Sequence, residues 1–235
     1  DNGTKTLTLR GIDFTTTAST AVKLPAGSTI VLADGSTNAI RSGDVTLSIK
    51  DDYRNQAFVN ALDAAGTLTI QGGEKGTGTL SVKAGALKNN GDGWVYSSGI
   101  SVNGDFTVKG GQVTIQGGAV ESDGSCFSIG VNMDSNVKNK ALLVTGGTLT
   151  AFAGEAYELE EGGTKRAVFS RGVYLYQGNV TVSGSGRLRA ESVEKMADAT
   201  LLSNGLYVSV GDLNIAFTKA SSVQSSASCA FFIKA

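Results

Sequence analysis

One block of sequence recurs along this chain, and its recurrence limits the possible folds more than any other feature. The block begins with serine and glycine, continues as a short alternation of apolar and polar residues, turns at Gly-Asp or Gly-Asn, and ends in a second short alternation. Copies are SGISVNGDFTV from Ser98, SRGVYLYQGNVTV from Ser170 and SNGLYVSVGDLNI from Ser203, with a looser copy, SIGVNM, from Ser128. A glycine corner and a third alternation follow, as in GGQVTIQGG from Gly110. Repeats of this kind predict a solenoid.

Three short strands per repeat cannot bury their own apolar side chains, so successive repeats must stack with equivalent strands paired in parallel. The sequence therefore predicts an all-β fold, a right-handed parallel β-helix of about seven rungs, in which each repeat forms one rung. The handedness rests on the general preference of parallel crossovers. A length of 235 residues with 32 glycines suits one repetitive domain over residues 1–235. A β-propeller or sandwich would need longer, evenly spaced strands.

Period-two alternation gives a register for the first strand of each repeat. The first inward positions are Val22, Val59, Ile100, Val131, Val173, Leu206 and Phe231. The second inward positions are Leu24, Ala61, Val102, Met133, Leu175, Val208 and Ile233. All of these residues are apolar, and their unequal spacing places the insertions between a third strand and the next first strand.

The composition argues against several classes of function. Histidine is absent, which excludes Ser-His-Asp and Cys-His catalysis and histidine metal sites. The net charge of −1 gives no reason to expect nucleic-acid binding, which needs a clustered basic surface. No run of about 18 apolar residues is present, so membrane insertion is not expected.

Two sets of polar residues have simple structural interpretations. Cys126 and Cys229 both precede first strands three repeats apart, which predicts a separation of about 14 Å and no disulfide. Asp105, Asn179 and Asp212 recur at the second corner, where Asp and Asn are typical turn residues.

The outward positions between the inward ones form columns along the solenoid. The first column is Lys23, Asn60, Ser101, Asn132, Tyr174, Tyr207 and Phe232, and the second is Pro25, Leu62, Asn103, Asp134, Tyr176, Ser209 and Lys234. The aromatic members of the first column should stack at the strand spacing of about 4.8 Å. Such a column suits sugar rings, whose C–H faces lie on aromatic faces while polar neighbours bond the hydroxyls. The candidate ligand-binding residues are therefore Tyr174, Tyr207, Phe232, Tyr176, Trp94, Asp134, Arg171 and Lys234.

A structural interpretation of the same column stays open. Aromatic neighbours on adjacent strands also stabilise a sheet, and an inserted loop or partner can cover them. Trp94, in the insertion NNGDGWVYSS, is as well explained by anchoring that loop as by contacting a ligand.

Carboxylates make calcium a candidate ion, although no ligand set can be assigned. Asp51 and Asp52 lie in one insertion, and Glu158, Glu160 and Glu161 lie in another. Oxygen-rich loops suit calcium, but neither group has a defining spacing, and adjacent loop carboxylates are commonly solvated.

The run TLTLRGIDFTTTASTAVKLPAGSTIVLADGSTNAI, followed by GTLTIQGG and SGISVNGDFTVKGGQVTI, resembles a bacterial family of extracellular carbohydrate-binding domains. The resemblance covers most of the chain in pattern. It implies a right-handed parallel β-helix, non-catalytic binding of plant cell-wall polysaccharides including acidic pectic chains, and bound calcium. It assigns no calcium ligand to a position of this sequence.

We expect a secreted or cell-surface domain that binds cell-wall or plant polysaccharide, pectic or cellulosic, without catalysis. One alternative is a structural stalk or adhesin module that docks another protein, with an adjacent domain beyond the C-terminus. A further alternative is a calcium-dependent polysaccharide lyase with Arg171 as proton acceptor.

Overall fold

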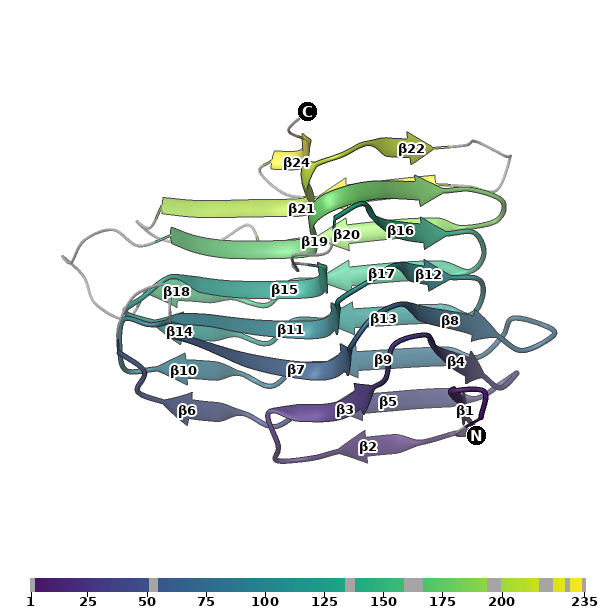
Figure 1. Ribbon diagram of the computed structural model, residues 1–235, viewed down its shortest axis with the longest axis horizontal. Helices are drawn as coiled ribbons and strands as arrows, with labels where there is room; N and C mark the ends of the chain where they lie inside the picture. Colours follow the sequence, from purple (N-terminus) through teal and green to yellow (C-terminus); the bar gives the residue numbers. More distant parts are fainter. Residues whose placement is uncertain are drawn as a thin grey trace.

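The computed structural model describes residues 3–50, 55–133, 138–158, 167–193, 200–215, 222–226 and 229–233. In these ranges the chain consists of β-strands, turns and irregular segments, and it contains no helix. No helix that could cross a membrane is found among them. Figure 1 shows the strands stacked in layers, from the N-terminal strands at the bottom to the C-terminal ones at the top.

The strands form four stacks of parallel strands, which we call sheets A to D, and β19 joins sheets A and C into one continuous sheet. Sheet A contains β1 Thr6–Leu9, β4 Ser28–Leu32, β8 Leu68–Gly72, β12 Phe106–Val108, β16 Lys140–Val144, the end of β19 Ala167–Val182, and β22 Leu213–Ile215. Sheet B contains β2 Asp13–Thr15, β5 Thr37–Arg41, β9 Thr79–Lys83, β13 Gln112–Gln116, β17 Thr148–Phe152, β20 Arg187–Glu191 and β23 Ser222–Ser226. Sheet C contains β3 Thr20–Leu24, β7 Gln56–Ala64, β11 Trp94–Val102, β15 Cys126–Met133, the start of β19, β21 Thr200–Val210, and β24 Cys229–Ile233. Sheet D contains β6 Val45–Leu47, β10 Leu87–Asn89, β14 Val120–Ser122 and β18 Ala156–Glu158.

The chain passes through sheets A, B and C in turn, so the prediction of a parallel β-helix is confirmed. Its handedness stays a prediction. The rungs are larger than expected, because the insertions after the sheet B strands form sheet D. The sheet C strands β7, β11, β15 and β19 have 9, 9, 8 and 16 residues, so they are longer than the short strands that were predicted. Their first halves extend beside sheet D.

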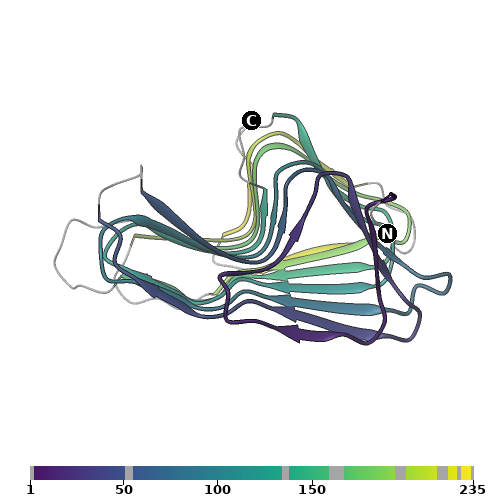
Figure 2. The same ribbon diagram turned by 60° about the horizontal axis from the view of Figure 1, so that its bottom comes forward.

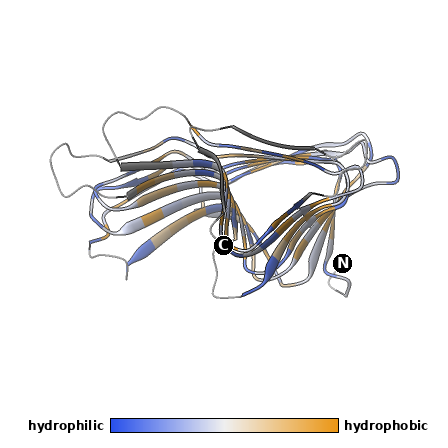
Figure 3. Cartoon of the chain, turned by 90° about the horizontal axis from the view of Figure 1, so that it is seen from above, coloured by the Kyte–Doolittle hydropathy of each residue, from blue (hydrophilic) through white to orange (hydrophobic). Residues whose placement is uncertain are grey.

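The cross-section therefore has two lobes with separate cores. Figure 2 shows a triangular lobe and a flat arm. The triangular lobe, bounded by sheets A, B and the second half of sheet C, holds the larger cluster, including Leu32, Ile70 and Ile100. The smaller cluster, including Val95 and Val120, fills the arm between sheet D and the first half of sheet C. Hydrophobic and hydrophilic residues alternate along the strands, as Figure 3 shows.

A ladder of serines joins the two sides of the waist between the lobes. The Ser97 Oγ donates to the carbonyl of Gly85 at 2.8 Å and accepts from the N–H of Gly118 at 3.0 Å. One strand further on, the Ser128 Oγ donates to the carbonyl of Gly118 and accepts from the N–H of Gly154, both at 2.7 Å. The serine of the repeated motif therefore satisfies buried backbone groups at the glycine corner opposite.

The glycine of the same motif allows the two sides to approach closely. A Cβ on Gly99 would lie 2.5 Å from the Ile115 Cγ2 and 2.8 Å from the carbonyl oxygen of Gln116. A Cβ on Gly130 would lie 2.8 Å from the Phe152 carbonyl oxygen. These positions need glycine for space, because no side chain fits against the opposite backbone.

The predicted register is confirmed in six repeats and is wrong by three residues in one. Val22 and Ile100 both pair with Leu62, not with Val59. Val59 instead belongs to the core of the arm, and Leu62, predicted to face outward, is fully buried. This repeat has Ala61 in place of the motif glycine, so apolar alternation alone did not fix the alignment.

The corner residues Asp105 and Asn179, predicted as turn residues, bond the backbone of the next rung. The Asp105 Oδ1 accepts from the N–H of Ala141 at 2.8 Å, and the Asn179 Oδ1 accepts from the N–H of Asp212 at 2.9 Å. Each side chain thus bonds the backbone one rung further along.

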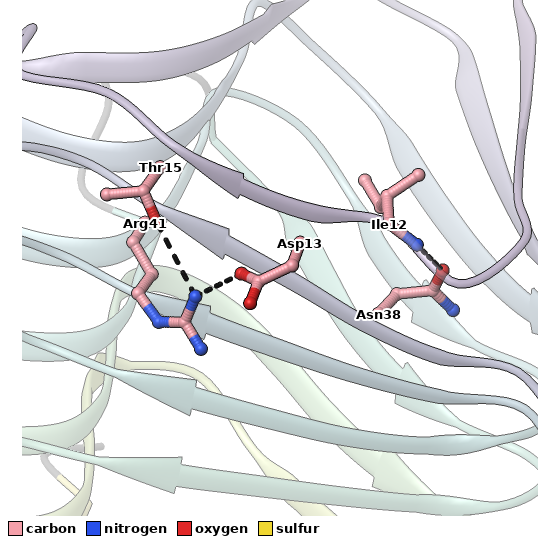
Figure 4. A network of polar contacts seen from close by, with 5 residues as sticks. All are labelled: Ile12, Asp13, Thr15, Asn38 and Arg41. Atoms are coloured by element: carbon pink, nitrogen blue, oxygen red, sulfur yellow. Dashed lines mark hydrogen bonds and ion pairs between the residues drawn. The ribbon is translucent and has the colours of Figure 1, made fainter.

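A buried asparagine links the first rungs in a related way. The Asn38 Oδ1 accepts from the N–H groups of Gly11 and Ile12, and its Nδ2 donates to the carbonyl of Thr79 at 2.9 Å. Figure 4 shows the Ile12 contact beside the exposed ion pair between Arg41 and Asp13. The asparagine therefore connects three successive rungs.

The two cysteines lie three strands apart in sheet C. Cys126 begins β15 and is buried in the arm, while Cys229 begins β24. Strands β19 and β21 lie between them, and Cys229 pairs with Asn204 rather than Leu201, so their separation exceeds the three-strand spacing of about 14 Å. This distance is too long for a disulfide, in agreement with the prediction.

Candidate functional site: a groove on the outer face of sheet C

The outer face of sheet C is folded into a groove. The middle strands bend where their pairing skips Gly99 and its equivalents, so the two halves of each strand form two walls. The floor is the column of residues just before the bend, namely Asn60, Ser98, Ile129, Arg171 and Asn204. All five floor residues are buried.

One wall is an aromatic ladder made of Phe58, Tyr96, Phe127 and Phe169. Their ring centroids are 4.9, 4.2 and 4.4 Å apart in that order, and the interplanar angles are 16°, 7° and 6°. Each inner ring is covered on both faces by its neighbours, and Tyr96 and Phe127 are buried. The ladder therefore contributes mainly to stability along its length, with a gain beyond simple burial for each stacked pair.

The side chains of the facing wall change from polar to aromatic along the solenoid. Its column runs Lys23, Asp63, Ser101, Asn132, Tyr174 and Tyr207. The N-terminal half of this wall is thus polar, and the C-terminal half is aromatic.

At its C-terminal end the groove is filled. The Arg171 Cζ lies 4.4 Å from the centroid of the Phe169 ring, 4.5 Å from that of Tyr174 and 4.0 Å from that of Tyr207. The guanidinium thus bridges the two walls, and Arg171 as a whole is only 4% exposed. This arrangement is a cation–π cluster within the structure.

At its N-terminal end the groove is open. A hollow of about 610 Å³ is lined by Thr20, Lys23, Gln56, Phe58, Asn60, Asp63, Tyr96, Ser101, Asn103 and Asn132. Phe58 ends the ladder there and is 47% exposed. Within the described part of the chain Phe58 stacks on Tyr96 alone, and β3 begins two positions too late to cover its other side.

Of the ligand-binding residues predicted from the sequence, some lie in this groove and others lie elsewhere on the protein. Tyr174 and Tyr207 pair across strands as predicted, with centroids 5.4 Å apart, but both are half-buried against Arg171. Tyr176 is exposed and lies opposite Ser209. Trp94 is half-buried and packs against Phe127, at the edge of the ladder.

Three of the predicted residues cannot be placed as side chains. The backbone of Phe232 pairs with Tyr207, as the predicted column requires, and nothing further is described for it. Asp134 and Lys234 lie outside the described residues.

The ladder and the open end of the groove were not predicted from the sequence. A signal was available, since Phe127 and Phe169 directly precede the motif serine, and Tyr96 directly precedes Ser97, which pairs with the motif serine Ser128. The register error placed Asn60 in the outward column to which Asp63 belongs. Neither residue was therefore recognised as part of the groove.

The charges around the open end balance. Lys23 and Asp63 are cross-strand neighbours, and the remaining lining residues are uncharged. In the described ranges, no three acidic or cysteine side chains converge on a point where a metal could bind. Asp51, Asp52, Glu160 and Glu161 lie outside those ranges, and of Glu158 only the backbone is described.

A second hollow, of about 570 Å³, lies on the opposite side of the waist. Its floor is formed by the glycine corners at Gly85, Gly118 and Gly154. Their N–H groups already donate to Ser42, Ser97 and Ser128, so this floor offers few free donors to a ligand.

No protein-family model, curated protein or solved structure matches the chain. The function of the groove therefore has to follow from its own residues.

Proposed function

We propose that this chain binds a polysaccharide, without catalysis, in the groove on the outer face of sheet C. The observation that carries this proposal is an exposed aromatic face, Phe58, at the end of a hollow lined by amide and hydroxyl side chains. Aromatic faces pack against the C–H faces of sugar rings, and amides and hydroxyls bond sugar hydroxyls in both directions. The groove also crosses successive strands, so it can follow a polymer along the solenoid.

The location and the source of the ligand belong to the same proposal. A cell-surface or secreted domain of this kind would meet a plant or bacterial cell-wall polysaccharide, of the pectic or cellulosic type. The similarity of the sequence pattern to that of extracellular carbohydrate-binding domains supports this proposal. Its implied calcium has no ligand set among the described residues.

A glycan array of plant and bacterial cell-wall polysaccharides tests the proposal, with affinity electrophoresis as a second method. We expect retention by at least one polysaccharide and no release of product from it. Absence of binding to every polysaccharide in both assays would refute the proposed function.

A stalk or adhesin module is the second candidate function, and a different observation favours it. The N-terminal end of the triangular lobe has an apolar hollow of about 700 Å³, where Leu7, Ile12 and Phe14 are exposed. Among the described residues, β1, β2 and β3 are the terminal strands of their sheets at this end, which suits a β-layer from another polypeptide. A photo-crosslinking residue at position 14 should then capture a protein neighbour on intact cells, while one at position 58 should not.

A polysaccharide lyase has less support. Its proposed proton acceptor, Arg171, packs between three aromatic rings and is nearly inaccessible. A general base must reach the proton that it removes.

A further inference from the structure

We infer that the open end of the groove is a subsite for an uncharged sugar ring, built on Phe58 and Asn60. This inference rests on the proposed function and gives it a location and a ligand class. The observations behind it are the exposed ring, an unsatisfied amide and the charge balance of the hollow.

Phe58 supplies the stacking surface. Its ring lies on Tyr96 with centroids 4.9 Å apart, which holds it in one orientation although 47% of the residue is exposed. An exposed ring that is held by a stacked neighbour loses little freedom when a ligand covers it. Phe14, which is 42% exposed, has no such stacked ring within the described chain.

Asn60 supplies a hydrogen-bond acceptor for the ligand. It lies on the floor of the hollow, is 7% exposed, and its Oδ1 has no hydrogen-bond partner among the described residues. Native proteins rarely bury a carbonyl without a partner, so a hydrogen-bond donor in the hollow, such as a ligand hydroxyl, would satisfy this group. The Asn60 Oδ1 can only accept, and because the atom is buried, a ligand hydroxyl would donate to it after rotation of the amide.

The negative charge of Asp63 should favour the binding of neutral sugars over acidic ones. The carboxylate of Asp63 lies on the facing wall, next to the one lysine of the lining, Lys23. A uronate has hydroxyls that can donate to Asn60 as well, but it adds a carboxylate, which Asp63 repels and which only Lys23 in this lining can pair with. A neutral pyranose offers several hydroxyl donors and no charge.

The test uses the whole chain with two oligosaccharides of equal length, cellohexaose and hexagalacturonate, in isothermal titration calorimetry. We expect cellohexaose to bind about tenfold more tightly or better. Phe58→Ala and Asn60→Leu should each weaken cellohexaose binding about tenfold, whereas Phe58→Trp should retain it. Phe14→Ala is the matched control and should leave binding unchanged.

Folding and binding effects are separated by thermal unfolding of each variant. Asn60→Leu removes an unsatisfied buried amide, so its unfolding midpoint should equal or exceed that of the parent. Cellohexaose binding that survives both Phe58→Ala and Asn60→Leu would overturn the subsite while leaving polysaccharide binding elsewhere on the face intact. Tighter binding of hexagalacturonate than of cellohexaose would overturn the uncharged ligand class alone. Failure of the parent to bind any glycan would remove the proposed function and the subsite together.

Discussion

Arg171 and Tyr207 lie on neighbouring strands of sheet C, with the guanidinium carbon 4.0 Å from the centroid of the tyrosine ring. The same guanidinium contacts Phe169 and Tyr174, so one buried cation joins both walls of the groove at its C-terminal end. This end of the groove is therefore part of the packed structure, and the proposed ligand site is at the other end.

The first prediction concerns Arg171 itself. Arg171→Leu should lower the free energy of unfolding by about 1–3 kcal/mol, because it removes cation–π contacts from a desolvated position. Urea unfolding followed by Trp94 fluorescence measures this change. Binding of cellohexaose at the open end should persist in the folded variant. A variant of unchanged stability that loses all glycan binding would instead make Arg171 a ligand contact.

The second prediction separates Tyr174 from Tyr176. Tyr174→Ala should destabilise the protein by about 1–3 kcal/mol, because it uncovers the guanidinium of Arg171 and leaves a gap beside Tyr207. Tyr176→Ala removes an exposed ring opposite Ser209 and should change stability by no more than about 0.5 kcal/mol. Thermal unfolding of both variants provides the comparison. Equal effects would contradict the difference in packing.

These two tyrosines also show how far the sequence could predict the structure. Their columns followed from period-two alternation once the repeats were aligned on Ser and Gly, and the structure has the same pairing. The burial of Tyr174 could not be predicted in the same way, because it depends on Arg171 from the first half of its own strand. The bend at Gly172 brings the two halves together, and alternation alone does not reveal a bend.

The repeat around Asn60 shows a second limit. Both Val59-x-Ala61 and Leu62-x-Ala64 fit an apolar alternation, so hydrophobicity allowed two registers. The motif serine and glycine, which fix the alignment elsewhere, are replaced here by Val59 and Ala61. The open end of the groove was therefore not predicted, because it lies at the one repeat that lacks the motif and whose register was wrong.

The third prediction concerns the serine ladder. Ser128→Ala should destabilise the protein by about 1–3 kcal/mol, because the carbonyl of Gly118 and the N–H of Gly154 lose a buried partner. Ser209→Ala is a control on the outer face of the same sheet and should have little effect. Chemical unfolding measures both, and similar curves for the two variants would show that the ladder contributes nothing.

The fourth prediction concerns pH. The backbone N–H groups of Lys75 and Thr77 donate to the Asp34 carboxylate, and this lowers the pKa of Asp34 below its usual value. A carboxyl whose folded pKa lies below its unfolded pKa stabilises the fold above the unfolded pKa, and this contribution is lost as pH falls through the folded pKa.

Acidification should therefore loosen the loop around Lys75 before the core strands respond. The amide resonances of Lys75 and Thr77, followed by NMR between neutral and acidic pH, measure this change. Asp34→Asn should remove the pH dependence at both amides. An unchanged titration in that variant would assign the effect to another group.

The last prediction reverses the charge preference of the groove. Asp63→Lys replaces the one lining carboxylate with a second cation beside Lys23, so the lining of the open end carries two positive charges. Hexagalacturonate should then bind about tenfold more tightly than it does to the parent, and the gain should shrink in high salt because exposed charges are screened. Asp63→Asn should give an intermediate affinity, since it removes repulsion without adding attraction. Calorimetry at low and high salt measures all three proteins, and a gain that salt does not reduce would mean that the added lysine acts other than by charge.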